Sequence, residues 1–204
     1  MEVHEIIKFK MQNKIIFAAL LITLGVLFRT VWHLGPNVEF ITSACLLSGS
    51  YLGRKWAILV PVFIMLTSDL IIGNTNIFIF TWSAYIVVGI LGYWGLKNKN
   101  ARLPDGQEKL KITKIIKATG LGIIASLWFY LWTNFGVWLL DSWGMYPRTI
   151  TGLVDAYILG LPFLKYNLMG NLVFVPVSFS LVEIVKSIRL DTNYLFKKIE
   201  KILS

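Results

Sequence analysis

Long uninterrupted runs of apolar residues constrain this chain more than any other feature of its sequence. The hydrocarbon core of a bilayer is about 30 Å thick, and a helix needs about 20 apolar residues to cross it. We predict six crossings, at residues 15–32, 38–52, 56–72, 77–96, 115–140 and 166–185. Of the 204 residues, 56% are hydrophobic and only 15% are charged, which excludes a soluble domain of this size. The sequence therefore predicts an all-α, polytopic membrane protein in a single integral membrane domain, residues 1–204.

The second and third predicted crossings contain residues that perturb or tighten helices. The second is short and begins directly after Gly35-Pro36, a pair that breaks helices. Gly49 in this crossing and Gly53 directly after it are four residues apart, a spacing that mostly serves close helix packing. The third carries Pro61 inside it.

The stretch between the last two crossings, residues 141–165, has a different character, because aromatic, polar, Gly and Pro residues crowd together there. Six apolar residues in it recur at the spacing of one helical stripe: Ile150, Leu153, Val154, Tyr157, Ile158 and Leu161. This helical part is too short to cross the bilayer. We therefore predict an outer interfacial helix that forms the lid and wall of a small-molecule site.

Basic residues define the orientation of the predicted crossings. With the N-terminus in the cytoplasm, all of the 20 Lys and Arg residues except Arg29, Arg148 and Lys165 fall in inner segments, including a polar linker at 97–114. The positive-inside rule then predicts a cell-membrane protein with both termini cytoplasmic. The pattern of residues 191–204 predicts a basic amphipathic helix on the inner surface. This asymmetry and attraction to anionic lipid account for the net charge of +9, so nucleic acid is not an expected partner.

Under this orientation the rare polar side chains fall in the outer part of the molecule. A charged side chain inside a crossing costs about 2.5–3.5 kcal/mol on insertion scales and normally faces a partner or a wet cavity. Arg29 and Asp69 each lie about one turn from the outer end of their crossings, at matching depth. We predict that they can pair, either as a structural lock between two crossings or as a ligand contact.

Helical spacing predicts two further stripes of polar and aromatic residues. Tyr130, Asn134 and Trp138 follow one another at intervals of four, and Asn167, Asn171 and Phe174 lie on one face of the last crossing. Amides and aromatic rings on facing helices suit an apolar pocket with a few orienting hydrogen bonds. In the alternative interpretation the aromatic residues form an interfacial belt, which is favoured for Trp128, Trp132 and Trp143, and the amides bridge helices. The full substrate-binding set predicted is Arg29, Asn37, Asp69, Asn134, Trp138, Tyr146, Arg148, Asp155 and Asn171.

The residue types in this set indicate the contacts that they would make. Arg29 or Arg148 would meet a carboxylate or phosphate, Asp69 or Asp155 an amine or hydroxyl, and Trp138 the face of a ring. Such a pocket fits many small zwitterions.

Signatures of catalysis are weak. His4 and His33 would lie on opposite sides of the membrane, and Cys45 has no partner at metal-ligand or disulfide spacing. There is no Gly-rich phosphate loop. Asp69 and Glu39 can form a carboxylate pair by proximity only. We therefore predict no catalytic or metal-binding residues, no cofactor and no enzymatic activity, while an integral membrane enzyme or a ligand-free structural protein remain the alternatives.

Several short motifs resemble a known class of transport protein. Six crossings with both ends inside, a short second crossing opening with Pro36-Asn37, an Asp near the end of the third and an outer lid before the sixth resemble the S components of energy-coupling factor (ECF) transporters. More narrowly, the chain resembles an uncharacterised bacterial membrane family of that clan over about residues 29–182. The runs that carry this likeness are Pro36-Asn37-Val38-Glu39-Phe40, Ser68-Asp69, Thr133-Asn134-Phe135-Gly136-Val137-Trp138, Tyr146-Pro147-Arg148-Thr149, Gly152-Leu153 and Gly160-Leu161-Pro162-Phe163.

The resemblance implies a substrate-binding membrane subunit of a small-molecule uptake transporter. S components bind a vitamin, a vitamin precursor or a metal ion on the outer side, dock onto a transmembrane coupling protein driven by two ATPases, and topple to release the ligand inside. The partners implied here are a small-molecule ligand, the lipid bilayer, and the ECF coupling protein and ATPase subunits. S components often dock through an Ala-xxx-Ala face of the first crossing. In this chain Ala18 and Gly25, seven residues apart, share the small-residue face.

Overall fold

All regular structure is helical in the part of the chain that the computed structural model describes, which is residues 2–32, 35, 37–73, 76–96, 107–141 and 144–203. The elements are α1 (Glu2–Thr30), α2 (Ile41–Leu47), a π-helical turn η1 (Ser48–Leu52), α3 (Arg54–Ile72), α4 (Phe78–Leu96), α5 (Gln107–Leu140) and α6 (Ile150–Leu203). All five long helices contain segments long and apolar enough to cross a membrane. The protein is therefore an all-helical, multi-pass membrane protein. The expectations for His33, Trp143 and the side chain of His4 lie outside the described residues.

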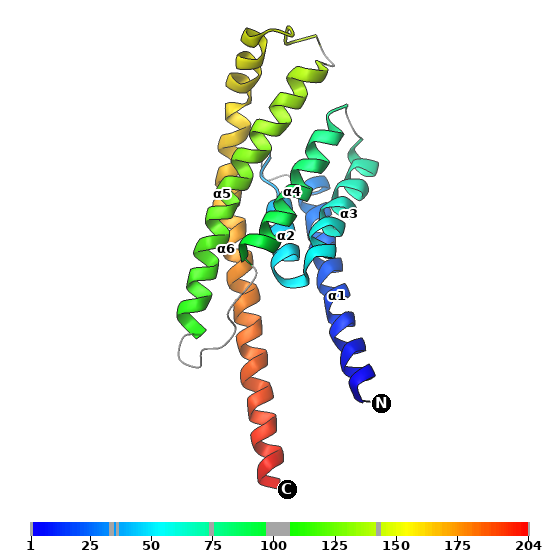
Figure 1. Cartoon of the computed structure of the whole chain (residues 1–204), viewed down its shortest axis with the longest axis vertical. Coiled ribbons are helices and arrows are strands. Elements are labelled where there is room, and N and C mark those ends of the chain that lie inside the picture. The colour runs from blue at the N-terminus through cyan, green and yellow to red at the C-terminus, as the bar shows by residue number, and fades with distance from the viewer. Residues whose placement is uncertain are drawn as a thin grey trace.

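The helices alternate in direction, and both termini lie at the same end of the molecule (Figure 1). We call the opposite end the distal end. The helices α1, α3 and α5 run towards the distal end, and α4 and α6 return from it (Figure 1). The second predicted crossing is helical only over Ile41–Leu52, about 18 Å at the usual rise, which is shorter than a bilayer. All seven α2 residues are buried, so this segment forms the centre of the bundle.

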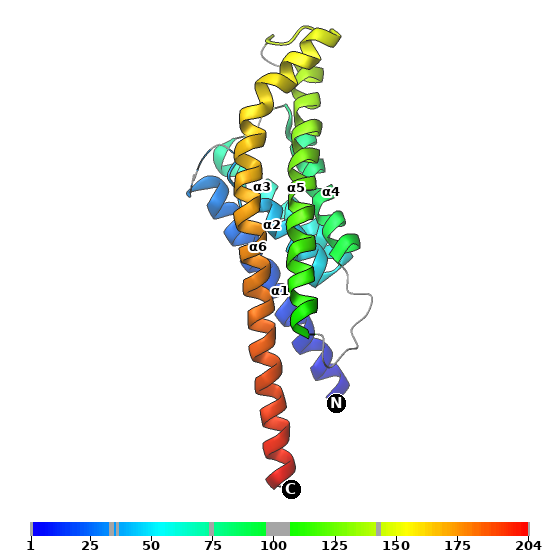
Figure 2. The same cartoon turned by 90° about the vertical axis from the view of Figure 1, so that its left-hand side faces the viewer.

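The helix α6 joins three segments that the sequence separates. The predicted outer helix and the sixth crossing at 166–185 lie in one continuous helix, Ile150–Leu203, which also includes most of the predicted tail, so a separate interfacial helix is not confirmed. Pro162 lies inside this helix, where a proline removes one hydrogen bond and can bend a helix without ending it. Figure 2 shows the first turns of α6 leaning across α5 before the helix straightens. We call residues 150–161 the α6 arm.

The predicted linker at 97–114 is also partly helical, because α5 already begins at Gln107. Contacts with α6 explain this difference. Lys111 Nζ donates to Ser187 Oγ over 2.6 Å, and Lys114 Nζ lies 3.6 Å from Glu183 Oε1. The hydroxyl of Tyr51 in η1 donates to the same carboxylate over 2.6 Å. Charged residues that look like a loop therefore belong to a helix whose polar face has partners.

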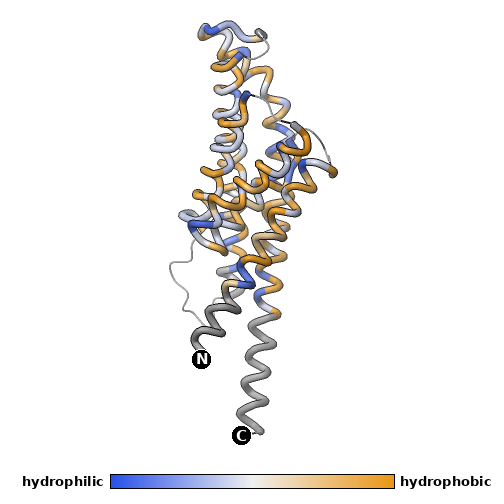
Figure 3. The backbone as a smooth tube through the Cα atoms, turned by 90° about the vertical axis from the view of Figure 1, so that its right-hand side faces the viewer, coloured by the Kyte–Doolittle hydropathy of each residue, from blue (hydrophilic) through white to orange (hydrophobic). Residues whose placement is uncertain are grey.

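Small residues set the spacing in the centre of the bundle. A Cβ at Gly49 would clash with the backbone of α4 at Gly89, and a Cβ at Gly89 would clash with the carbonyl oxygen of Ala57 in α3. The prediction of close packing is therefore confirmed for Gly49. Gly53 instead has open space around it and a φ of 100°, so it serves the turn between η1 and α3. Apolar residues follow the middle of the bundle and polar ones gather towards its ends (Figure 3).

Alanine at Gly89 tests this packing against a matched glycine. Gly89→Ala forces a methyl group into the α3 backbone, and overpacking of this kind costs about 1–3 kcal/mol. Gly120→Ala places the same methyl group in open space within α5, where alanine favours a helix by up to about 1 kcal/mol. We expect the first variant to lower the thermal unfolding midpoint in detergent and the second to leave it unchanged or raise it. Equal midpoints would contradict the close approach of α3 and α4.

Candidate functional site

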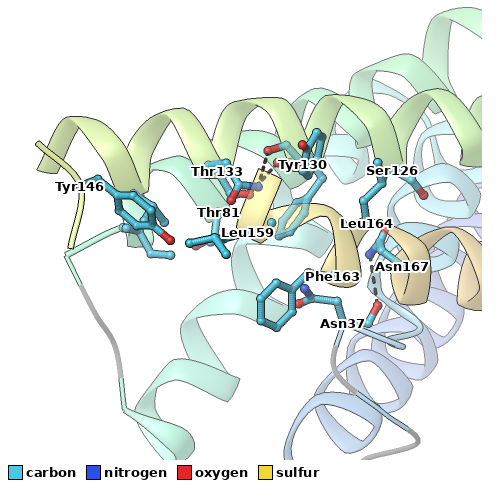
Figure 4. A pocket seen from close by; sticks show the side chains of 15 residues that line it. Asn37, Thr81, Ser126, Tyr130, Thr133, Tyr146, Leu159, Phe163, Leu164 and Asn167 are labelled. Carbon is cyan, nitrogen blue, oxygen red and sulfur yellow. Dashed lines mark hydrogen bonds between the residues drawn. The ribbon is translucent and has the colours of Figure 1, made fainter. Parts of the chain in front are cut away.

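A pocket of about 270 Å³ lies between α5 and α6, in the distal half of the molecule (Figure 4). The start of α4, the segment before α2 and the turn before α6 complete its wall. Its lining consists of Asn37, Ile77, Thr81, Ser126, Phe129, Tyr130, Thr133, Asn134, Val137, Tyr146, Leu159, Gly160, Phe163, Leu164 and Asn167. All of these residues are apolar, hydroxyl-bearing or amide-bearing.

One stripe of α5 forms the longest wall of the pocket. Its lining residues, Ser126 to Val137, recur at intervals of three and four, which places them on one helical face. The Thr133–Trp138 motif supplies the distal end of this stripe. Gly136 lies on another face, where a Cβ would collide with the ring of Phe80 in α4. The motif thus combines a pocket-facing pair, Thr133 and Asn134, with a small residue that lets α4 pack closely.

The α6 arm and the turn after it form the facing wall. A Cβ at Gly160 would collide with the side-chain amide of Asn134, so glycine allows the arm to reach α5 there. Two tyrosines fasten the arm further along. The Tyr130 hydroxyl donates to the carbonyl oxygen of Tyr157 over 2.6 Å, and the Tyr157 hydroxyl donates to that of Leu131 over 3.2 Å. The arm is therefore held over the pocket by side-chain to backbone hydrogen bonds.

Tyr146 reaches the pocket because of the turn that carries it. Asp141 has a positive φ of 39°, and its Oδ1 accepts hydrogen bonds from the backbone N–H groups of Met145 and Tyr146 at 2.8 and 3.0 Å. Only glycine fits at position 152, where a Cβ would clash with the carbonyl oxygen of Pro147. Thr149 caps α6 by accepting from the Gly152 N–H over 3.2 Å. We call residues 144–149 the Tyr146 turn.

Amides close the pocket towards the centre of the molecule. The Asn171 amide is buried and donates to Ser126 Oγ over 2.8 Å and to Asn167 Oδ1 over 3.0 Å. Asn167 Nδ2 in turn donates to the backbone carbonyl of Asn37 over 3.2 Å. These bonds join α5, α6 and the segment before α2. Asn171 is one layer below the pocket, whereas Asn37 and Asn167 line it.

Arg29 and Asp69 form the predicted ion pair, which is confirmed, and the pair lies outside the pocket lining. Arg29 Nη1 also donates to Ser68 Oγ, and its Nε lies 4.0 Å from Glu39 Oε2. The Asp69 carboxylate accepts a hydrogen bond from Trp82 Nε1 over 2.7 Å. The network thus joins α1 to α3 and α4. The carboxylates of Asp69 and Glu39 both lie against the Arg29 guanidinium, an arrangement that fits the structural alternative, in which the pair holds two crossings together.

The structure divides the nine predicted site residues into four groups. Asn37, Asn134 and Tyr146 line the pocket, and Asn171 supports it from below. Trp138 Nε1 donates to the carbonyl oxygen of Pro147 over 3.2 Å and so holds the Tyr146 turn. Arg29 and Asp69 form the ion pair. Arg148 and Asp155 are exposed and absent from the lining, so the expected contacts between charged residues and a ligand are not formed there.

Other residues of the site were not among the nine predicted, although Asn167 belonged to a predicted stripe. Ser126, Thr133, Phe163 and Asn167 line the pocket, and Thr81 joins them from α4. A signal for three of them was in the sequence, because Ser126 and Thr133 share a face with Tyr130, and Asn167 precedes Asn171 by one turn. Phe174 instead packs on the rings of Phe28 and Phe40 at centroid distances of 5.0 and 6.1 Å, and Trp132 Nε1 donates to Ser83 in α4 over 2.8 Å.

These features define a multi-pass helical membrane protein with a partly enclosed, uncharged pocket near one end of its bundle. The chain belongs to DUF6580, a family of unknown function, whose family model matches residues 9–193. No curated protein and no solved structure matches the chain.

Removing one member of the ion pair tests its structural role. In Arg29→Met the buried Asp69 carboxylate loses its guanidinium, a change that costs about 3–5 kcal/mol in comparable buried pairs. We expect a large fall in the thermal unfolding midpoint of the ligand-free protein. The double variant Arg29→Met/Asp69→Leu should lose less, because the buried Asp69 carboxylate is removed together with its partner.

The control for this experiment is Arg148→Met, which removes an exposed arginine. It should leave the midpoint within the error of the measurement. If Arg29→Met and Arg148→Met behave alike, Arg29 is not a structural lock.

Proposed function

We propose that this protein is the substrate-binding membrane subunit of an ECF-type uptake transporter and captures a small molecule in its distal pocket. The observation that carries the proposal is the pocket itself, a space of about 270 Å³ between α5 and α6. Concave, mostly apolar sites with a few placed polar groups are the usual form of small-molecule sites, and they occur between the helices of bundles. The S-component resemblance adds the transport role.

The proposed orientation places the distal end outside the cell and both termini inside. The segments at the terminal end carry most of the basic residues, in agreement with the positive-inside rule. Six passes, with the short buried Ile41–Leu52 segment as the second, return the C-terminus to the side of the N-terminus. The pocket then faces the side from which a nutrient arrives.

The α6 arm and the Tyr146 turn take the place of the outer lid in this proposal. Both contribute side chains to the pocket, and both are fastened to α5 by hydrogen bonds at their edges. Pro162 lies between the arm and the rest of α6, where it weakens the helix. Small rotations of the arm about this point would open and close the pocket.

Capture is favoured over catalysis by the chemistry of the lining. The pocket offers hydroxyl groups, amides and aromatic rings, which orient a ligand but do not transfer protons readily at neutral pH. The carboxylates of Asp69 and Glu39, which a membrane enzyme would use, lie against Arg29.

Ligand retention tests the proposed capture role. We expect the purified protein to carry a small molecule that mass spectrometry detects in the extract of the denatured protein. Thr133→Phe fills the pocket and should abolish retention. Thr119→Phe is the matched control, because Thr119 lies on the same helix outside the pocket and makes the same type of hydroxyl to carbonyl bond. An extract that is the same for wild type and Thr133→Phe would refute capture in this pocket.

Coupling to an ATP-driven module has its own candidate surface on α1. Only 17% of the α1 crossing is buried, against 39% for α3 and α4. Its small-residue face is already used inside the chain, since Ala18 is buried and Gly25 packs against Ile64 of α3. The side chains of Ile16 and Leu20 are exposed on another face. We propose that this apolar face meets the transmembrane coupling protein.

Purification from native membranes tests the coupling role. We expect the tagged wild-type protein to bring down a transmembrane partner and ATPase subunits, identified by mass spectrometry. Leu20→Trp should reduce this recovery by enlarging a side chain at the contact. Leu181→Trp changes an equally exposed leucine on α6 and should have no effect. Recovery of no ATPase with the wild type would contradict an ECF mechanism and leave ligand capture unaffected.

A further inference from the structure

The pocket lining described by the structure contains no ionisable acid or base other than two tyrosines. A charged ligand would lose its hydration there, and transfer of an unpaired ion into a protein interior costs several kcal/mol. Arg29 and Asp69 are engaged with each other, and Arg148 and Asp155 are exposed outside the lining. None of the four charged residues predicted for the site lies in the described lining, where it would compensate a ligand charge.

Backbone groups at the start of α4 do not replace the missing charge. Helix N-termini can stabilise anions through free N–H groups. Ile77 and Thr81 line the pocket, but the N–H groups of Phe80 and Thr81 already donate to the Ile77 carbonyl over 2.9 and 3.1 Å.

The hydroxyl groups of the lining mostly present lone pairs to the pocket, because their hydrogens are used within the protein. Thr81 donates to Phe78, Thr133 to Phe129, Ser126 to Gly122 and Tyr130 to Tyr157, each time to a backbone carbonyl. A hydroxyl that donates in this way can still accept. The pocket is therefore richer in free acceptors than in free donors, which suits a ligand with N–H or O–H groups.

Tyr146 is the exception among the hydroxyl groups of the described lining. Its residue surface is only 7% exposed, and within the described residues its hydroxyl has no hydrogen-bond partner. Figure 4 shows the ring and hydroxyl pointing into the pocket. A tyrosine hydroxyl can both donate and accept a hydrogen bond, so this one is free to bond to a molecule in the pocket. A ligand that bonds to this hydroxyl would satisfy it.

Size and shape limit the ligand further. A dry engineered cavity of about 150 Å³ holds benzene, and ordinary small-molecule pockets begin at about 300 Å³. A volume of about 270 Å³ therefore fits a molecule of one or two rings. Phe129, Tyr130, Tyr146 and Phe163 supply aromatic surface on several sides, which favours a ring over a flexible chain.

We infer that the pocket binds a neutral ring compound whose edge carries N–H or O–H donors, and that the Tyr146 hydroxyl is a ligand contact that discriminates for it. This inference rests on the proposed capture function and narrows its substrate class. The inferred ligand is uncharged, whereas the charged residues of the predicted set had suggested a zwitterion.

Three probes of equal size test the charge preference. Benzamide is neutral and carries N–H donors, benzoate is an anion, and benzylammonium is a cation. We expect millimolar benzamide to raise the thermal unfolding midpoint of the full-length protein in detergent, with a saturable concentration dependence. Benzoate and benzylammonium should give smaller shifts at the same concentrations. Thr133→Phe should abolish the benzamide shift.

Tyr146→Phe tests the proposed contact, because it removes the hydroxyl and keeps the ring. Loss of one neutral hydrogen bond should weaken benzamide binding roughly three- to tenfold. Tyr166→Phe is the control, since Tyr166 is exposed on α6 outside the lining. It should leave benzamide binding unchanged. Equal weakening in both variants, or none in Tyr146→Phe, would refute the contact.

The outcomes distinguish a failure of this inference from a failure of the proposed capture function. A shift by benzoate or benzylammonium as large as that by benzamide, or no shift by any probe, overturns the neutral-ligand inference. The capture function would still be supported after such a result if a compound is extracted from the wild type and is absent from Thr133→Phe. If the two extracts are the same, both the capture function and the inference fail.

Discussion

Polar groups at membrane depth must find their partners inside the protein, and this constraint organises the whole bundle. Lipid offers no hydrogen bonds, so an unpaired polar group there is costly. Arg29 meets Asp69 and Ser68 across α1 and α3, and Asn171 bonds to Ser126 and Asn167 across α5 and α6. At the terminal end Glu183 receives Tyr51 and Lys114. Each set of bonds fixes the register of two or more helices, which apolar packing alone does not specify.

This rule is only partly met among the described residues: Ser43 Oγ, Ser50 Oγ and Trp128 Nε1 are buried without a hydrogen-bond partner, and the pocket contains a further hydroxyl of this kind. The pocket's hydroxyl groups give their hydrogens to backbone carbonyls and keep lone pairs free, and the Tyr146 hydroxyl has no partner among the described residues. A hydroxyl that faces the pocket without a partner is available to a ligand. The absence of charge in the lining has the same physical origin, because a charged side chain facing an empty apolar space would have no compensation.

The sequence predicted the parts of this structure that depend on local pattern. Apolar runs located the helices, and depth matching located the partner of Arg29. Spacing along α5 placed Asn134 and Tyr130 on the pocket face. It failed for Trp138, because at eight residues from Tyr130 the stripe has drifted and Val137 takes the position. Nothing in the spacing shows that Arg148 and Asp155 are exposed outside the pocket lining, since this depends on how the Tyr146 turn and the α6 arm pack together at Pro147 and Gly152. Two predictions based on proline and on charge also differ from the structure. Pro162 does not end α6, and Lys111 and Lys114 of the predicted linker are helical because α6 supplies their partners.

Two kinds of packing explain why the pocket lies between α5 and α6. In the centre, glycines bring backbones together, as Gly49 does against Gly89 and Gly89 against Ala57. In the distal half the α6 arm touches α5 closely at Gly160 and is otherwise held by long tyrosine side chains that reach backbone carbonyls. Two helices kept apart by tyrosines enclose a volume that neither fills. Backbone-to-backbone packing at glycines therefore holds the centre of the bundle together. The looser packing between α5 and the α6 arm leaves the volume in which a ligand would be held, next to an arm able to move.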